Sequence, residues 1–136
     1  MQTFLPYPDF TKSLSCLDYR RLGKQRVEAK QLINALTGVS SGWRNHPAAR
    51  MWSNNIDALM LYHNVCLHCW EQRGYVNNMP YFSLPEYHAI EVPVWFGRKD
   101  FHDSHKSNLL RKAPEYYGPL GWDVPTDLEY VWPNPE

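Results

Sequence analysis

Residues 17–36 of the 136-residue chain are LDYRRLGKQRVEAKQLINAL, and their apolar side chains recur at helical intervals. At 3.6 residues per turn, five of them fall in one arc of about 100°, wide enough to face a core. These are Leu22, Ala29, Leu32, Ile33 and Leu36. We therefore predict a helix from about Asp18 to Leu36. Gly38 ends it, because glycine readily adopts the left-handed conformation that follows a helix.

The flank of this stripe places one carboxylate among cations. Within residues 20–30 the only acid is Glu28, and the cations are Arg20, Arg21, Lys24, Arg26 and Lys30. Spacings of three and four residues make Glu28 a surface neighbour of Lys24 and Gln25. The pattern fits an ordinary solvated helix face with ion pairs. It also fits a site that holds a polyanion beside a carboxylate.

Composition limits the class of protein. Fourteen Lys or Arg balance fourteen Asp or Glu, so the chain lacks the global positive charge of a strongly electrostatic nucleic-acid binder, although a local patch can still bind a polyanion. Three cysteines without a framework spacing favour a reducing compartment. No apolar run reaches membrane-spanning length, and no signal-peptide pattern is present. We expect one domain over residues 1–136, located in the cytoplasm.

The remaining sequence predicts an all-α fold of about three main helices with long ordered loops. Residues 1–10 contain two prolines and read as an extended segment. Thr11 is expected to cap a short helix to residue 14. Further helices are expected at 47–53, 56–73 and 99–112, with a short one at 86–90. Residues 75–100 otherwise read as an irregular loop, Pro114 as a helix end and the tail from Glu115 as irregular.

A metal site is the obvious interpretation of His63, Cys66, His68 and Cys69. Zinc sites usually combine two separated ligand pairs, whereas four ligands within seven helical residues cannot converge on one ion. We therefore expect buried structural side chains here, no metal and no cofactor.

Two other stretches combine polar, basic and aromatic residues. Residues 43–47 (WRNHP) place polar groups at a helix start, where backbone N–H groups attract anions. Residues 102–117 (HDSHKSNLLRKAPEYY) combine a His/Ser-rich face, a basic end and paired tyrosines. Each is also explained by helix capping and a basic helix C-terminus. Together with the first helix they predict a shared polyanion surface that suits nucleic acid: Arg20, Arg21, Lys24, Arg26, Arg44, Asn45, His46, His105, Lys106, Arg111, Lys112, Tyr116 and Tyr117.

The order of these motifs resembles a known family. Residues 21–29 (RLGKQRVEA), 42–47 (GWRNHP), 73–75 (RGY) and 109–117 (LLRKAPEYY) follow an extended N-terminus. This order resembles the pyrimidine-dimer DNA glycosylase/AP lyase family of the bacteriophage endonuclease V type, in a bacterial branch. The resemblance extends to about residue 118, and the tail after Trp122 matches nothing in it.

The resemblance implies a compact helical fold that acts on double-stranded DNA with a damaged or modified base. In that family the α-amino group attacks C1′ of the nucleotide, forms an imine and allows β-elimination, while a glutamate of the first helix assists. An α-amino group suits this role because it ordinarily has a lower pKa than a lysine side chain. Here the resemblance implies that Met1 and Glu28 are catalytic. We expect a monomer associated with the nucleoid.

Two departures from the family pattern affect this assignment. Bulky Gln2 is expected to leave Met1 in place, whereas the phage enzyme exposes a threonine. The family's Arg-Glu pair falls at Arg20-Arg21 or Lys24-Gln25, where no glutamate is present. Glu28 is the only carboxylate on that face, so either it takes over the role or the chemistry differs. The alternatives are a non-catalytic DNA- or nucleotide-binding domain of the same fold, a small protein-interaction domain, and a lysine nucleophile such as Lys24.

Overall fold

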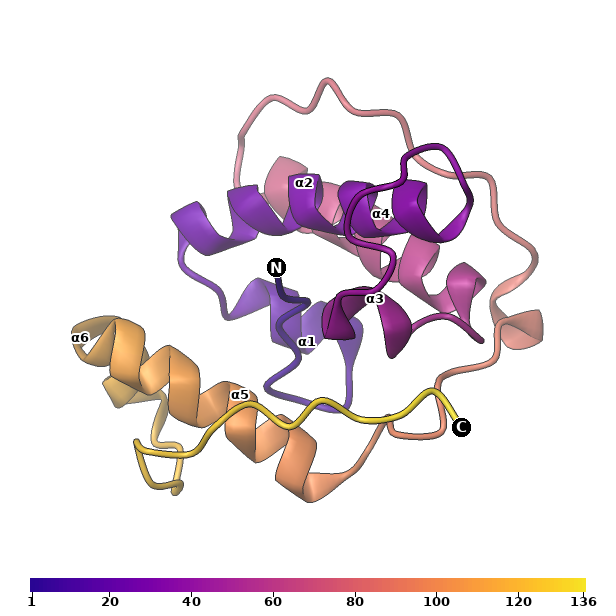
Figure 1. Ribbon diagram of the computed structural model, residues 1–136. Coiled ribbons are helices and arrows are strands. Elements are labelled where there is room, and N and C mark those ends of the chain that lie inside the picture. Colours follow the sequence, from indigo (N-terminus) through magenta and orange to yellow (C-terminus); the bar gives the residue numbers. More distant parts are fainter.

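The computed structural model describes residues 1–136 and contains helices but no strands (Figure 1). The prediction of an all-α fold with three main helices is confirmed: α2, α4 and α5 are the long ones. The elements are α1 (Phe10–Ser15), α2 (Tyr19–Leu36), α3 (Pro47–Arg50), α4 (Ile56–Gln72), η1 (Tyr87–Ala89), α5 (Lys99–Lys112), α6 (Pro114–Tyr117) and η2 (Gly118–Leu120).

Local signals explain most of the helix ends. The side chain of Asp18 caps α2 by accepting a hydrogen bond from the Arg21 N–H, and Gly38 follows its end at φ 83°. The expectation that Thr11 caps α1 is wrong, because Asp9 accepts the Lys12 N–H at 2.7 Å and the helix begins at Phe10. Pro114 ends α5 as predicted, but it also begins α6, since proline suits the first position of a helix.

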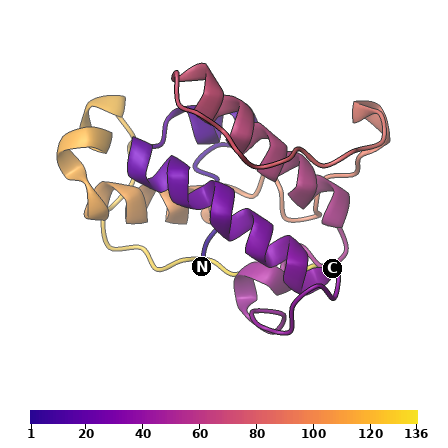
Figure 2. The same ribbon diagram turned by 90° about the horizontal axis from the view of Figure 1, so that it is seen from above.

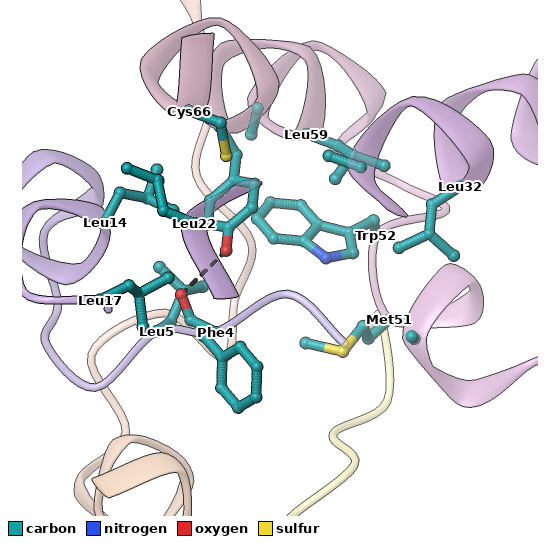
Figure 3. Close-up of a cluster of buried hydrophobic side chains, with 14 of the residues drawn as sticks. Phe4, Leu5, Leu14, Leu17, Leu22, Leu32, Met51, Trp52, Leu59 and Cys66 are labelled. Atoms are coloured by element: carbon teal, nitrogen blue, oxygen red, sulfur yellow. Dashed lines mark hydrogen bonds between the residues drawn. The ribbon is translucent and has the colours of Figure 1, made fainter. Parts of the chain in front are cut away.

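The core lies where α2 crosses α4, with α1 packed against α4 (Figure 2). Leu22 and Leu32 of the predicted stripe are fully buried, and they meet Trp52 and Leu59 from the α3–α4 region (Figure 3). Leu36, at the end of the stripe, is only partly buried.

The N-terminal segment is part of this core. Residues 2–6 are buried, and in Figure 1 the N-terminus lies between α2 and α5. Phe4 and Leu5 are among the core side chains in Figure 3. The extended segment was predicted for residues 1–10, but only residues 1–5 are free of helix and bend, since residues 6–9 are bends and α1 begins at Phe10. Because the N-terminal segment lies inside the molecule, its backbone polar groups need partners from the surrounding helices.

The C-terminal strap, residues 121–136, runs across α5 as the yellow segment of Figure 1. Ser104 Oγ accepts the Val131 N–H at 3.2 Å, and Ser107 Oγ accepts the Leu128 N–H at 3.0 Å. These serines are buried. The prediction that the His/Ser-rich face of α5 belongs to a DNA-binding surface is therefore wrong: this face points inward and binds the strap and the N-terminal segment.

Candidate active site

Glu28 and Gln25 of α2 bind the backbone of the first residues. The Gln2 N–H donates to Glu28 Oε2 at 3.1 Å. The Gln25 side-chain amide donates to the Gln2 carbonyl at 2.9 Å and accepts the Phe4 N–H at 2.8 Å. The same amide also donates to Glu28 Oε2 at 3.3 Å. One buried glutamine thus fixes both the start of the chain and the carboxylate beside it.

Side chains of α4 and α5 continue this arrangement. The Tyr62 hydroxyl lies 2.9 Å from the Phe4 carbonyl and 2.5 Å from Gln25 Oε1. His105 Nδ1 accepts the Leu5 N–H at 2.9 Å, and His102 Nδ1 lies 2.7 Å from the Leu5 carbonyl. We call these five side chains, Gln25, Glu28, Tyr62, His102 and His105, the N-terminal cradle. Together they fix the position of the chain's first residues.

Both histidines of the cradle are held neutral. His105 must accept at Nδ1, and His102 Nε2 accepts the Gly97 N–H at 3.0 Å while its Nδ1 faces a carbonyl. Burial lowers the pKa of His105 to about 3, with a further contribution from neighbouring His102. Burial also lowers the pKa of His102. A proton on either ring would therefore oppose the folded arrangement.

Met1 and Glu28 line one pocket of about 380 Å³, within the range of about 300–1,000 Å³ typical of small-ligand sites. Four cations surround it: Arg20, Arg21, Lys24 and Lys112. Gln2, Phe4, Gln25 and Tyr130 complete the lining. The Glu28 carboxylate is thus surrounded by the start of the chain and by cations that are far apart in the sequence.

The four cations differ in their partners. Arg21 forms an ion pair with Asp18 at 3.1 Å, whereas Arg20, Lys24 and Lys112 form no salt bridge within the chain. Burial alone would raise the pKa of Asp18, but hydrogen bonds from Tyr117 and Arg21 outweigh it and lower that pKa. Three positive side chains thus line the pocket without a salt bridge and outnumber its one carboxylate, Glu28, which favours an anionic ligand.

His46 of the His-Pro turn is not among the residues that line this pocket. It caps α3, its Nδ1 accepting the Ala48 N–H at 3.0 Å. Burial and then the charge of the N-terminal ammonium lower its pKa, while Glu28 opposes them. His46 therefore lies within electrostatic reach of both predicted catalytic groups. Arg44 and Asn45, in the same turn, are exposed, and Arg44 donates to the Ala35 carbonyl at 3.4 Å.

Two predicted DNA contacts are wrong because the side chains are fully buried. His105 binds the Leu5 N–H inside the core, and Tyr117 lies 2.5 Å from Asp18 Oδ1 through its hydroxyl. Burial and this hydrogen bond raise the pKa of Tyr117. Neither ring can stack on DNA in this fold.

Other predicted contacts lie away from the pocket. Arg26 stacks on Trp70, and partly buried Lys106 lies near Tyr7 and Asp103. Arg111 holds the strap by donating to the Leu128 carbonyl at 3.1 Å and to the Thr126 carbonyl. Of these four predicted contacts, only Tyr116 is an aromatic residue with an exposed ring, and 46 % of the residue is exposed.

Sequence reasoning missed the residues that position the site. Gln25 lies three residues after Leu22 and four before Ala29, so it falls inside the buried stripe. A polar residue on a buried stripe needs a buried hydrogen-bond partner. This was the only feature of the sequence that indicated the cradle. Gln2 also lines the pocket, and its buried Nε2 has no hydrogen-bond partner. Tyr130 comes from the tail to which no role was given.

The helix carrying His63, Cys66, His68 and Cys69 brings no three His, Cys, Asp or Glu side chains close enough to hold a metal ion. His63 packs edge-on against Phe82, with ring centroids 4.9 Å apart. Burial raises the pKa of Cys66 far above its ordinary value, as expected for an inert packed thiol. None of the helices is both long and apolar enough to cross a bilayer.

Fold and pocket together define a small helical protein with a carboxylate and the chain terminus in a cationic pocket. Among known protein families, the model of the pyrimidine dimer DNA glycosylases matches residues 1–83, well over half of the chain. The chain belongs to the pyrimidine dimer DNA glycosylase family. The match includes α2 and the His-Pro turn but ends before α5. Searches of curated proteins and of solved structures gave no significant match.

Proposed function

We propose that the protein cleaves the N-glycosidic bond of a damaged pyrimidine in double-stranded DNA and then nicks the strand as an AP lyase. The nucleophile is the α-amino group of Met1, and Glu28 assists it. The observation that carries this proposal is the 3.1 Å hydrogen bond from the Gln2 N–H to Glu28 within the cationic pocket.

This contact limits where the amine can be. Only the Cα and the carbonyl carbon of Met1 separate its amino nitrogen from the Gln2 nitrogen, so the amine stays within a few Å of it. The cradle fixes the backbone of Gln2, Phe4 and Leu5 through five hydrogen bonds. A nucleophile held in this way requires little further ordering before attack.

In the first step the amine lone pair forms a bond to C1′, and the bond from C1′ to the base breaks. The base leaves with the bonding electrons and takes a proton. The Glu28 carboxylate stabilises positive charge that develops on the sugar, and it accepts the proton that the amine loses. Since base release needs only the amine, the carboxylate and solvent protons, the reaction requires no cofactor.

In the second step the sugar ring opens. The bond from C1′ to the ring oxygen breaks, that oxygen takes the proton from Glu28, and C1′ becomes an imine carbon. Loss of a C2′ proton then drives departure of the 3′ phosphate, which nicks the strand. Water finally hydrolyses the imine and frees the amine.

The unpaired cations account for DNA binding. Arg20, Lys24 and Lys112 border the pocket without a salt bridge, so they are available to the phosphates on either side of the damaged nucleotide. We assign further DNA contacts to Arg44, Asn45 and His46 of the turn that precedes α3. All of these groups belong to one chain, so we propose a monomer that works on nucleoid DNA in the cytoplasm.

Borohydride trapping on a duplex with one abasic site tests the proposal. Borohydride reduces the imine to a stable amine, so the wild-type protein should become covalently linked to DNA. A chain extended by two residues before Met1 should lose this product. On dimer-containing DNA, Glu28→Gln should lower the rate of glycosidic-bond cleavage, measured as alkali-labile strand nicks, at least 100-fold, because general acid–base catalysis contributes about 10²–10⁴. The matched control is Glu115→Gln, an exposed acid of α6.

Each competing function predicts a different result. Trapping of the extended chain at the normal rate would identify a lysine as nucleophile. Tight binding to DNA without any trapping would leave a non-catalytic DNA-binding domain. Absence of DNA binding altogether would favour a protein-interaction domain.

A further inference from the structure

Tyr130 brings the C-terminal strap into the pocket described above. The family match ends at residue 83, so it includes neither α5 nor the strap. Side chains of α5 bind the strap on both sides of Tyr130: Ser104 Oγ accepts the Val131 N–H, and Ser107 Oγ accepts the Leu128 N–H. The backbone of the strap is therefore fixed where it passes the pocket.

The ring of Tyr130 is also fixed, because three aromatic side chains surround it. Its centroid lies 5.6 Å from that of His105, 5.7 Å from that of Trp132 and 6.4 Å from that of Phe4. His105 and Phe4 are buried, so the ring packs against the core. A ring held in this way keeps its hydroxyl at one position, which a group that stabilises a transition state requires.

The Tyr130 hydroxyl is a free hydrogen-bond donor at the pocket. The charges that act on it are those of Arg111, Arg21 and Glu28, and the last two line the pocket. No hydrogen bond within the chain acts on this hydroxyl, and it is not among the fully buried polar groups. Burial raises the pKa of Tyr130 to about 12. The hydroxyl therefore keeps its proton at neutral pH and can donate it to an acceptor in the pocket.

Donors lie on two sides of the chain terminus. Three cations of the pocket belong to α2, whereas Lys112 ends α5 and Tyr130 lies on the strap that α5 binds. In Figure 1 the N-terminus lies between α2 and α5. Lys112 and Tyr130 thus provide a second set of donors, separate from the cations of α2.

We propose that Tyr130, together with Lys112, donates a hydrogen bond to the phosphate that departs when the strand is nicked. This inference rests on the proposed function. Glu28, which has by then given its proton to the ring oxygen, takes a proton from C2′. The electrons of that C–H bond form the double bond between C2′ and C3′, and the bond from C3′ to oxygen breaks with its electron pair on the phosphate.

This step increases the charge of the phosphate. A diester with one negative charge becomes a monoester with a charge of about −1.5 to −2 at pH 7. A donor at this phosphate therefore binds the transition state more strongly than the imine that precedes it, which raises the rate of the step. Formation of the imine does not change the phosphate, so the hydroxyl should not affect the first step.

Tyr130→Phe tests the role of the hydroxyl, because it keeps the ring. On a duplex with one preformed abasic site, single-turnover nicking without borohydride should fall at least tenfold, since one such donor contributes about 10²–10³ in a closed site and Tyr130 is partly exposed. Borohydride trapping should stay within twofold of the wild type, with a larger share of trapped complexes on an uncut strand. Tyr87→Phe is the matched control, since Tyr87 is 80 % exposed on η1.

A better leaving group separates the hydrogen bond from a loss of structure. Replacing the 3′ bridging oxygen of the abasic nucleotide by sulfur makes the bond to C3′ easier to break, so the deficit of Tyr130→Phe should shrink to less than threefold. Unchanged nicking, an equal loss of trapping and nicking, or the same deficit on the sulfur duplex would overturn the role of the hydroxyl alone. A wild-type protein that neither nicks nor is trapped would refute the proposed function, and this inference with it.

Discussion

The two flanks of α2 carry the same kinds of side chain and use them differently. On the pocket flank, Arg20 and Lys24 line an open cavity and form no ion pair. On the α4 flank, Arg26 lies 4.1 Å above the Trp70 ring and Lys30 lies 4.5 Å above Phe82. One pair of cations is available to a ligand, and the other is part of the packing.

The neighbours of each flank cause this difference. Trp70 stacks on Tyr75, with ring centroids 4.3 Å apart, and so presents a face to the Arg26 guanidinium. Burial there lowers the pKa of Arg26. The pocket flank instead faces the start of the chain, and Lys24 makes no cation–π contact there. A count of the cations on α2 therefore overestimates how many of them are available to bind DNA. The following predictions test whether the two flanks differ in this way.

Acid should destabilise the folded protein mainly through His105, the α5 residue that accepts the Leu5 N–H. The pKa of His105 is about 3 in the folded protein, below its ordinary value of 6.5, so the unfolded chain binds a proton that the folded chain does not. Stability should fall as the pH drops below about 6.5 and keep falling to about 3. The slope approaches about 1.4 kcal/mol per pH unit below the ordinary pKa, which gives a loss of about 2 kcal/mol between pH 6.5 and 4.5.

Urea unfolding across this pH range measures that loss. His105→Gln keeps an acceptor for the Leu5 N–H but has no group that takes up a proton. The pH slope of its unfolding free energy should therefore be smaller by the amount that one bound proton contributes. An identical pH slope in both proteins would assign the acid sensitivity to other histidines.

The double variant Arg20→Ala/Lys24→Ala should weaken DNA binding without changing stability. Each lost phosphate contact removes about 0.9 from the slope of log affinity against log salt, so two contacts give about 30-fold, or about 2 kcal/mol, near physiological salt. A salt titration by anisotropy gives the slope, and thermal unfolding gives the control. A slope equal to the wild type would show that these cations do not contact phosphates.

Arg26→Ala should have the opposite profile. Loss of the cation–π contact and of the packed stem should cost about 1 kcal/mol of unfolding free energy, with unchanged DNA affinity. Arg26→Met should recover part of the loss, because methionine also packs on an aromatic ring. Loss of DNA affinity comparable to that of the pocket-flank variant would remove the distinction between the flanks.

Lys30→Ala should give the smallest effect, about 0.5 kcal/mol, since an exposed cation–π contact is worth about 0.5–1 kcal/mol. Chemical denaturation resolves a change of this size when the denaturant slopes match. A change in base release with this variant would indicate that the α4 flank also touches DNA.

Periodicity and stop signals predicted the three long helices, because those signals are local. The cradle residues other than Glu28 escaped prediction because their partners are remote: Gln25 meets Tyr62 of α4, and His105 meets Leu5. His105 and Tyr117 were assigned to a DNA-binding surface because a His/Ser-rich face, a basic helix end and paired tyrosines suit nucleic acid. Their actual partners lie 100 and 99 residues away. Glu28 was found because a lone acid among cations is visible in the sequence itself.

The N-terminal cradle also sets the order in which the protein becomes complete. During synthesis residues 2–5 emerge first, yet His102 and His105 of α5 emerge about a hundred residues later. Such long-range contacts form late in folding, because the intervening chain must first be closed into a loop. A chain that stops at α4 contains Gln25 and Glu28 but has no anchor for the Leu5 backbone. The backbone of Leu5 is therefore anchored only when nearly the whole chain is present, whereas the contacts of Gln2 and Phe4 need only the residues up to the end of α4.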